Sequence, residues 1–194
     1  MTPEISTTLF LEGASCSGKT YLLKTVADKD VAIILKNWPA NLNNPPTEFF
    51  LERDEDKLAR AKAAPEQIKL VDRAYLATLT FYKVLEEQEG VSAEPVVKWY
   101  INELGQKLYK PDHYIFVDVP GDVTKQRAKD CGRTMHDNNM WLKFPERINF
   151  WYNQLLAIYE PATSVYRIDG TQAPKVVEEQ FKDLLSDLRK GLVK

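Results

Sequence analysis

Cysteine is scarce in this sequence. Its two cysteines, Cys16 and Cys131, lie neither at the spacing of a zinc site nor in a disulfide framework. Long hydrophobic runs are missing too. No stretch approaches the ~18 uncharged apolar residues that cross a bilayer, and Met1–Thr8 lacks the basic start and apolar run of a signal peptide. We therefore expect a cytoplasmic protein with no membrane partner.

A strong charge of either sign is also missing. The formal net charge is −2, which gives no electrostatic reason to expect a nucleic-acid partner. Hydrophobic residues make up 44% of the chain and charged residues 28%, which is the balance of an ordinary globular protein. The 194 residues suit a single domain, 1–194, with a sizeable core, and a homodimer is left open.

What the sequence does contain is a series of short apolar runs separated by longer polar segments. Strands that helices cover on both faces become continuously apolar, as residues 31–35 are, so the runs indicate buried parallel strands. We predict strands at Thr7–Leu11, Val31–Leu35, Gln67–Val71, Tyr114–Val119 and Val165–Ile168. We predict helices at Lys19–Ala27, Asp54–Ala64, Ala74–Gln88, Pro95–Tyr109, Pro145–Tyr159 and Ala173–Arg189. This alternation predicts an α/β domain with right-handed crossovers.

Two segments lack a regular pattern. Residues 37–53 begin with a stretch rich in Asn and Pro and form a candidate acceptor loop. Residues 131–144 form a candidate lid. Long loops in compact domains are usually functional, so both segments are places to look for a site.

The most specific motif is a phosphate-binding loop (P-loop). The pattern G-x-x-x-x-G-K-[ST] is matched by Gly13, Ala14, Ser15, Cys16, Ser17, Gly18, Lys19 and Thr20, between a predicted strand and a predicted helix. Glycines let successive backbone N–H groups face one anion, and the helix N-terminus adds partial positive charge. We expect Lys19 to reach the β- and γ-phosphates of ATP, and the Thr20 hydroxyl to bind magnesium.

An acid–arginine pair follows the third predicted strand. Asp72 and Arg73 should face the same crevice as the P-loop, because ligands bind beyond the carboxyl ends of parallel strands. Asp72 could hold magnesium or accept a proton from an acceptor hydroxyl. Arg73 could hold phosphate oxygens with two parallel hydrogen bonds. A plain helix cap is the alternative, because Asp is a favoured N-cap residue.

A basic segment follows the fourth predicted strand. Arg133 lies beside Gly132 in the candidate lid, where it could meet the negative charge of a phosphoryl group in transfer. Arg127 lies near the end of the preceding helix and could also reach inward. Lys125 and Lys129 fit a solvated helix face instead.

Aromatic side chains gather in the segments that would surround an acceptor. A planar base or sugar ring could stack on one of them, although core packing is the ordinary role of any single aromatic. The set comprises Trp38, Phe49, Phe50, Tyr75, Phe81 and Tyr82. Of these we take Trp38, Phe49 and Tyr75, with Arg73, as candidate acceptor-binding residues. The later run of Trp141, Phe144, Phe150, Trp151 and Tyr152 is expected to pack a helix onto the sheet.

Together these residues resemble the thymidylate kinase and deoxynucleoside kinase group of P-loop kinases. The resemblance rests on the P-loop, on Asp72-Arg73 with Tyr75, on residues 115–120 leading to Arg127 and Arg133, and on residues 167–170. It implies a three-layer P-loop fold, with a five-stranded parallel sheet flanked by helices and a lid over the ATP site. It also implies ATP and magnesium as cofactors. The sequence departs from the group after the second strand, where Lys36-Asn37-Trp38-Pro39 carries no carboxylate.

The leading hypothesis is a kinase that transfers the γ-phosphate of ATP to a small acceptor, which we expect to be a nucleoside or a nucleoside monophosphate. A monophosphate needs only positioning because its oxygen is already anionic, whereas a hydroxyl acceptor gains from a base. Two alternatives are open. One is a kinase for a hydroxyl group of a sugar, antibiotic or other metabolite, and the other is an ATP-dependent switch or binding module.

Overall fold

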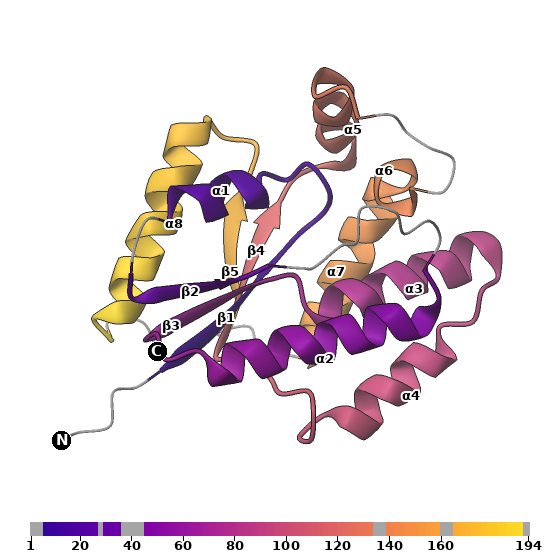
Figure 1. Ribbon diagram of the computed structural model, residues 1–194. Helices are drawn as coiled ribbons and strands as arrows, with labels where there is room; N and C mark the ends of the chain where they lie inside the picture. The colour runs from indigo at the N-terminus through magenta and orange to yellow at the C-terminus, as the bar shows by residue number, and fades with distance from the viewer. Residues whose placement is uncertain (1–5, 27–28, 36–44, 134–138, 160–164, 192–194) are drawn as a thin grey trace.

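A five-stranded parallel sheet lies at the centre of the structure (Figure 1). Its strands are β1 (Thr7–Glu12), β2 (Val31–Ile34), β3 (Ile68–Asp72), β4 (His113–Asp118) and β5 (Val165–Asp169). This computed structural model describes residues 6–26, 29–35, 45–133, 139–159 and 165–191. The strand order is β2-β3-β1-β4-β5. The chain therefore adds β2 and β3 on one side of β1, and then adds β4 and β5 on its other side. In such sheets the crevice for a ligand lies at that change of side, beyond the carboxyl ends of the strands.

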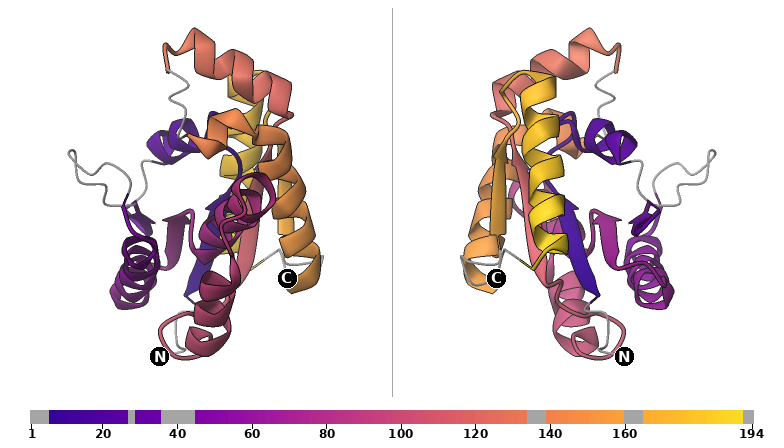
Figure 2. Two further views of the ribbon diagram at one scale, coloured as in Figure 1. Left: turned by 90° about the vertical axis from the view of Figure 1, so that its right-hand side faces the viewer. Right: turned by 90° about the vertical axis from the view of Figure 1, so that its left-hand side faces the viewer.

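Helices cover both faces of this sheet. They are α1 (Lys19–Thr25), α2 (Thr47–Ala63), α3 (Tyr75–Glu89), α4 (Glu94–Glu103), α5 (Gly121–Asp130), α6 (Met140–Lys143), α7 (Pro145–Tyr159) and α8 (Pro174–Arg189). Figure 2 shows α8 in front of the sheet in one view and behind it in the opposite view. Within the described residues, none of these helices has the length and apolar character to span a membrane.

The alternation of side chains along β1 explains the three layers. Leu9 and Leu11 point to one face, where they pack with Leu22 of α1 and Phe181 of α8. Phe10 points to the other face, where it joins the core formed with α2, α3 and α7. Both faces are buried at Leu9, Phe10 and Leu11, so this part of the strand is continuously apolar, as the sequence predicted. The predicted α/β fold with five parallel strands is confirmed.

Helix α2 begins earlier than the sequence pattern predicted. The expected start was Asp54, but the helix starts at Thr47, so residues 47–53 of the candidate acceptor loop are helical. Pro46 has an extended backbone at the N-cap position, and Glu48 places an acidic side chain in the first turn. Both features favour a helix start, which the abundance of Asn and Pro just upstream concealed.

Helix α4 and the candidate lid also differ from the prediction. Helix α4 ends at Glu103 rather than at Tyr109, because Gly105 takes a left-handed backbone with φ of 87° that cannot continue the helix. The candidate lid, 131–144, contains the short helix α6. Residues 134–138 of that segment and residues 37–44 of the candidate acceptor loop lie outside the described residues.

Candidate nucleotide-binding site

The P-loop turns between β1 and α1, which is the structural context that the motif requires. Gly13 and Gly18 have φ angles of 140° and 103°, and Cys16 also takes a left-handed conformation with φ of 56°. A Cβ atom added at Gly13 would lie 2.6 Å from the carbonyl oxygen of Val117. Glycine is therefore required at that position for space as well as for backbone conformation.

The side chain of Lys19 folds back over the loop that precedes it. Its Nζ atom donates hydrogen bonds to the carbonyl oxygens of Gly13 (2.8 Å) and Ala14 (2.6 Å) and to Ser17 Oγ (2.9 Å). The residue is only 6% exposed. The ammonium group thus lies within the curve of the loop, against the backbone that would surround bound phosphates.

A cavity of about 710 Å³ opens over this loop. It brings together residues that are far apart in the sequence and that were predicted from motifs to form the site. They are Ser15, Cys16, Ser17, Gly18, Lys19, Thr20, Asp72, Arg73, Arg127 and Arg133. Gln172, Pro174 and Val177 complete one wall, and no sequence motif had marked them.

Arg73 lies between the P-loop and an aromatic ring. Its Nη2 atom donates to the carbonyl oxygen of Gly13 at 3.3 Å, and its Cζ atom lies 4.1 Å from the centre of the Trp141 ring. Its Nε atom is buried and has no hydrogen-bond partner among the described residues. A buried donor of this kind is costly to leave unpaired, so the guanidinium group is suited to an anionic ligand.

Two further arginines enter the cavity from the end of α5 and from the segment after it. Arg127 donates from Nη2 to the carbonyl oxygen of Gly170 at 2.7 Å, which ties α5 to the turn after β5. Arg133 is exposed and follows Gly132, whose φ is 63°. With Arg73 and Lys19, these residues surround one space with positive charge.

Oxygen donors of the kind that magnesium takes are present at the same place. Asp72 is the last residue of β3 and pairs in register with Leu11 of β1, so it lies beside the entry to the P-loop. Thr20 is exposed on the first turn of α1. Magnesium binds one or two protein oxygens alongside nucleotide phosphates, and this hydroxyl and carboxylate fit that pattern.

The structure corrects the prediction for Tyr75. The residue is 1% exposed, its hydroxyl shares a 2.9 Å hydrogen bond with Tyr114, and its ring meets that of Phe10 edge-on. It lies at the start of α3 on the side facing the sheet, so it belongs to the core and not to an acceptor site. Phe49 contacts Phe50 on α2, with ring centres 5.7 Å apart, and does not line the nucleotide cavity. Trp38 lies outside the described residues.

A row of partly buried aromatic rings instead leads from α2 to Arg73. The rings of Phe50 and Phe81 lie 6.1 Å apart, and that of Phe81 stacks on Trp141 at 6.1 Å and 18°. Trp141 packs against the core as predicted, but it also covers the guanidinium group of Arg73. This second contact was not expected from the sequence.

Glu12 is a polar residue beside the P-loop that no sequence motif marks. It is fully buried at the end of β1, where its carboxyl group accepts hydrogen bonds from the backbone N–H of Ala74 and from the hydroxyl of Tyr152, both at 2.9 Å. Burial raises the pKa of Glu12 to about 7, and these two hydrogen bonds oppose the rise. A carboxylate directly before a P-loop glycine is a signal that could have drawn attention to it.

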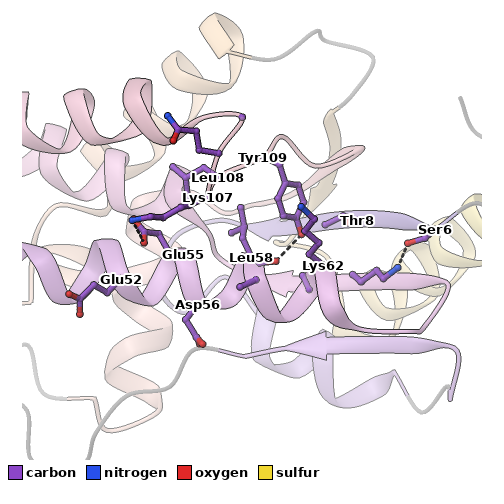
Figure 3. Close-up of a pocket in the computed structure, with 15 residues that line it drawn as sticks. Ser6, Thr8, Glu52, Glu55, Asp56, Leu58, Lys62, Lys107, Leu108 and Tyr109 are labelled. Carbon is purple, nitrogen blue, oxygen red and sulfur yellow. Dashed lines mark hydrogen bonds and ion pairs between the residues drawn. The ribbon is translucent and has the colours of Figure 1, made fainter.

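A second cavity, of about 650 Å³, lies at the opposite end of the strands (Figure 3). Two of its lysines have protein partners: Lys107 lies 3.1 Å from a carboxylate oxygen of Glu55, and Lys69 bonds to the hydroxyl of Ser6. Because ligands of parallel sheets bind at the carboxyl ends of the strands, the P-loop cavity is the stronger candidate site.

The fold is that of solved deoxyadenosine kinase structures. A deoxyadenosine kinase from M. mycoides with bound dATP superposes with a TM-score of 0.71 at 17% sequence identity, over 92% of this chain and 99% of that chain. A second structure of that enzyme, with products dCMP and a flexible dCDP bound, gives a TM-score of 0.68 at 18% identity, over 93% and 99%. This chain shares the fold of those deoxyadenosine kinase structures. The sequence itself matches no protein-family model and no curated protein.

Proposed function

We propose that this protein is an ATP- and magnesium-dependent phosphotransferase that moves the γ-phosphate of ATP to a nucleoside or nucleoside monophosphate. One observation carries the proposal: the P-loop, Asp72 and three arginines from separate segments line a single cavity. A P-loop alone binds nucleotides in many classes of protein. The added arginines and the carboxylate are what phosphoryl transfer to a second substrate needs.

The P-loop is the proposed binding site for ATP, the phosphate donor. Its backbone N–H groups and the N-terminus of α1 would hold the β-phosphate, with Lys19 between the β- and γ-phosphates. Thr20 would hold magnesium, which neutralises charge on the phosphates, and Asp72 would serve either as a second magnesium ligand or as the base. Arg127 and Arg133 would face the equatorial oxygens of the moving group, where charge is spread in the transition state.

The acceptor side is proposed to lie next to Arg73 and the aromatic row of Phe50, Phe81 and Trp141. Partly buried rings beside a guanidinium group suit a planar base on a sugar, because the rings stack and the arginine meets charge. The nucleotides bound in the two deoxyadenosine kinase structures support an acceptor of this class. For a nucleoside hydroxyl, Asp72 is the proposed base that accepts the proton.

The proposal includes a cytoplasmic location. Both cysteines are free thiols, in keeping with a reduced compartment where ATP is available.

The test is a phosphoryl-transfer assay with γ-labelled ATP, magnesium and a panel of nucleosides, nucleoside monophosphates, sugars and aminoglycosides. Label should appear on a nucleoside or its monophosphate and should be lost in Lys19→Ala. Label on a sugar or aminoglycoside alone would move the acceptor to another class. If no acceptor is labelled while ATP binding still depends on Lys19, the protein is not a kinase for this panel.

A further inference from the structure

Arg73 has a backbone conformation that needs support. Its φ angle is 52°, in the left-handed region that residues with a Cβ atom seldom adopt. Such conformations cost free energy and persist only where the surrounding structure fixes them, and they cluster at functional sites. The groups that hold Arg73 are therefore candidates for a role in the reaction.

The peptide groups on both sides of Arg73 are fixed by three hydrogen bonds to two other segments, β1 and α2. The Arg73 N–H donates to the carbonyl oxygen of Leu11 at 3.1 Å. Lys57 Nζ donates to the carbonyl oxygen of Arg73. The next N–H, that of Ala74, donates to Glu12 Oε1 at 2.9 Å. Two of these three partners are side chains that ionise and that lie far from Arg73 in the sequence.

Lys57 is itself held by a buried ion pair on α2. Its Nζ atom lies 2.7 Å from Asp54 Oδ1, and the two side chains are 1% and 0% exposed. Thr78 of α3 donates to Asp54 Oδ2 at 2.5 Å. Apolar residues of similar volume often replace buried ion pairs without loss of stability, so stability alone does not account for this one.

Glu12 reaches the same residue from β1. Its carboxyl group fixes the N–H that follows Arg73, while the next residue along the chain, Gly13, accepts a hydrogen bond from the Arg73 side chain at 3.3 Å. Backbone and guanidinium group are thus both placed relative to the P-loop. The opposite side of the guanidinium group is covered by Trp141.

We propose that Glu12, Asp54 and Lys57 are positioning residues that hold Arg73 in its left-handed conformation and so keep its guanidinium group over the P-loop. The role in turnover rests on the proposed function. The placement of Arg73 does not, and it can be measured in the protein without substrates.

The first measurement is the Nε–Hε signal of Arg73 in a ¹H–¹⁵N spectrum, assigned by its loss in Arg73→Lys. The Trp141 ring should displace this signal from the position of a solvated arginine. In Glu12→Met, which removes the acceptor of the Ala74 N–H, and in the double variant Asp54→Asn/Lys57→Met, which removes both charges of the buried ion pair, the displacement should be lost or reduced. A displacement equal to that of the wild-type protein in both variants would overturn the proposal.

The second measurement is turnover with the acceptor found by the labelling assay. Misplacement of a positioned group by about 1 Å can cost ~10²-fold in rate, so kcat should fall ~10- to 10²-fold while the Kd for ATP stays near the wild-type value. In an Arg73→Ala background the same substitutions should cause no further fall, because their effect passes through Arg73. An equal fold-loss in both backgrounds would show a merely structural role.

Two control variants separate positioning from general destabilisation. Lys98→Met removes a lysine of a solvent-exposed ion pair with Glu94 and should change neither measurement. Leu185→Ala removes a buried side chain of α8 and should lower stability without moving the Arg73 signal. If wild-type protein phosphorylates no acceptor while the Arg73 signal responds as expected, the proposed function fails and the positioning inference stands.

Discussion

The hydroxyl of Tyr152 donates a 2.9 Å hydrogen bond to Glu12 Oε2, across 140 residues of sequence. This bond joins α7 to the last residue of β1, directly before the P-loop. Both groups are fully buried, and burial raises the pKa of the Tyr152 hydroxyl as well as that of Glu12. The pair therefore links the ionisation of a buried carboxyl group to the stability of the segment that enters the P-loop.

Stability should fall as pH rises from about 5 to 8, and Glu12→Gln should flatten this dependence. In the unfolded chain Glu12 ionises near pH 4.5, whereas in the folded protein it keeps its proton up to about pH 7. In this pH window the folded state binds more protons than the unfolded state. The contribution of Glu12 to the free energy of unfolding is therefore complete below its unfolded-state pKa and lost above its folded-state pKa. Its size is at most ~3 kcal/mol.

Urea denaturation at several pH values would measure this dependence. Glu94→Gln is a suitable control because Glu94 is exposed on α4. If the Glu12→Gln protein retains the pH slope of the wild-type protein, Glu12 is not the group that titrates.

Gly13→Ala should destabilise the fold and abolish ATP binding. The new Cβ atom would lie 2.6 Å from the backbone oxygen of Val117, and the residue would keep a φ angle of 140°. Strain of this kind costs on the order of 1–3 kcal/mol before any movement of the loop. Gly105→Ala is the matched control, because its φ is 87° but no atom lies within 4 Å of the added Cβ. Gly105→Ala should therefore lose stability but keep ATP binding, as measured by denaturation and calorimetry.

The sequence alone predicted the residues of the candidate site better than it predicted the residues that support them. The P-loop and Asp72 lie at strand ends, where the topology of a parallel sheet fixes their position, so pattern and spacing were sufficient. Glu12 and Lys57 could not be placed in this way. Their roles depend on contacts with Ala74, Tyr152 and the Arg73 backbone, which arise from the pairing of β1 with β3 and from the packing of α2 and α7. The prediction that Tyr75 binds the acceptor was wrong for the same reason, because the sequence does not show which side of α3 faces the core.

Lys19→Met should weaken ATP binding by at least ~10-fold with the fold retained, because the substitution removes the charge that faces the β- and γ-phosphates. Calorimetric titration with ATP and magnesium would measure the Kd. Lys24→Met is the control: Lys24 is exposed at the end of the same helix and does not line the cavity. Equal affinity for ATP in the Lys19 variant and the wild-type protein would show that the P-loop does not bind the nucleotide.

Asp72→Asn should lower kcat for a hydroxyl acceptor by ~10²- to 10⁴-fold with little change in the Kd for ATP, as expected for loss of a general base. The decisive comparison is the dependence of rate on magnesium concentration. A shift of that dependence to higher magnesium, with kcat restored at saturation, would assign Asp72 to the metal instead. Asp122→Asn, on the exposed first turn of α5, controls for the change of surface charge.

Arg133→Ala and Arg127→Ala should both slow phosphoryl transfer, but in different ways. Arg133 is exposed at the cavity wall, so its loss should lower kcat by ~10²- to 10³-fold, the typical cost of removing a donor to developing charge, and leave stability unchanged. Arg127 also binds the carbonyl oxygen of Gly170, so its loss should lower both kcat and the melting temperature.

Arg133→Lys should restore only part of the rate, because lysine keeps the charge but not the paired donors of a guanidinium group. Lys129→Ala, on the exposed side of α5 and away from the cavity, should match the wild-type protein in both measurements. Wild-type kcat in Arg133→Ala would remove the segment after α5 from the reaction and leave Arg73 and Arg127 as the arginines that face the transferred phosphate.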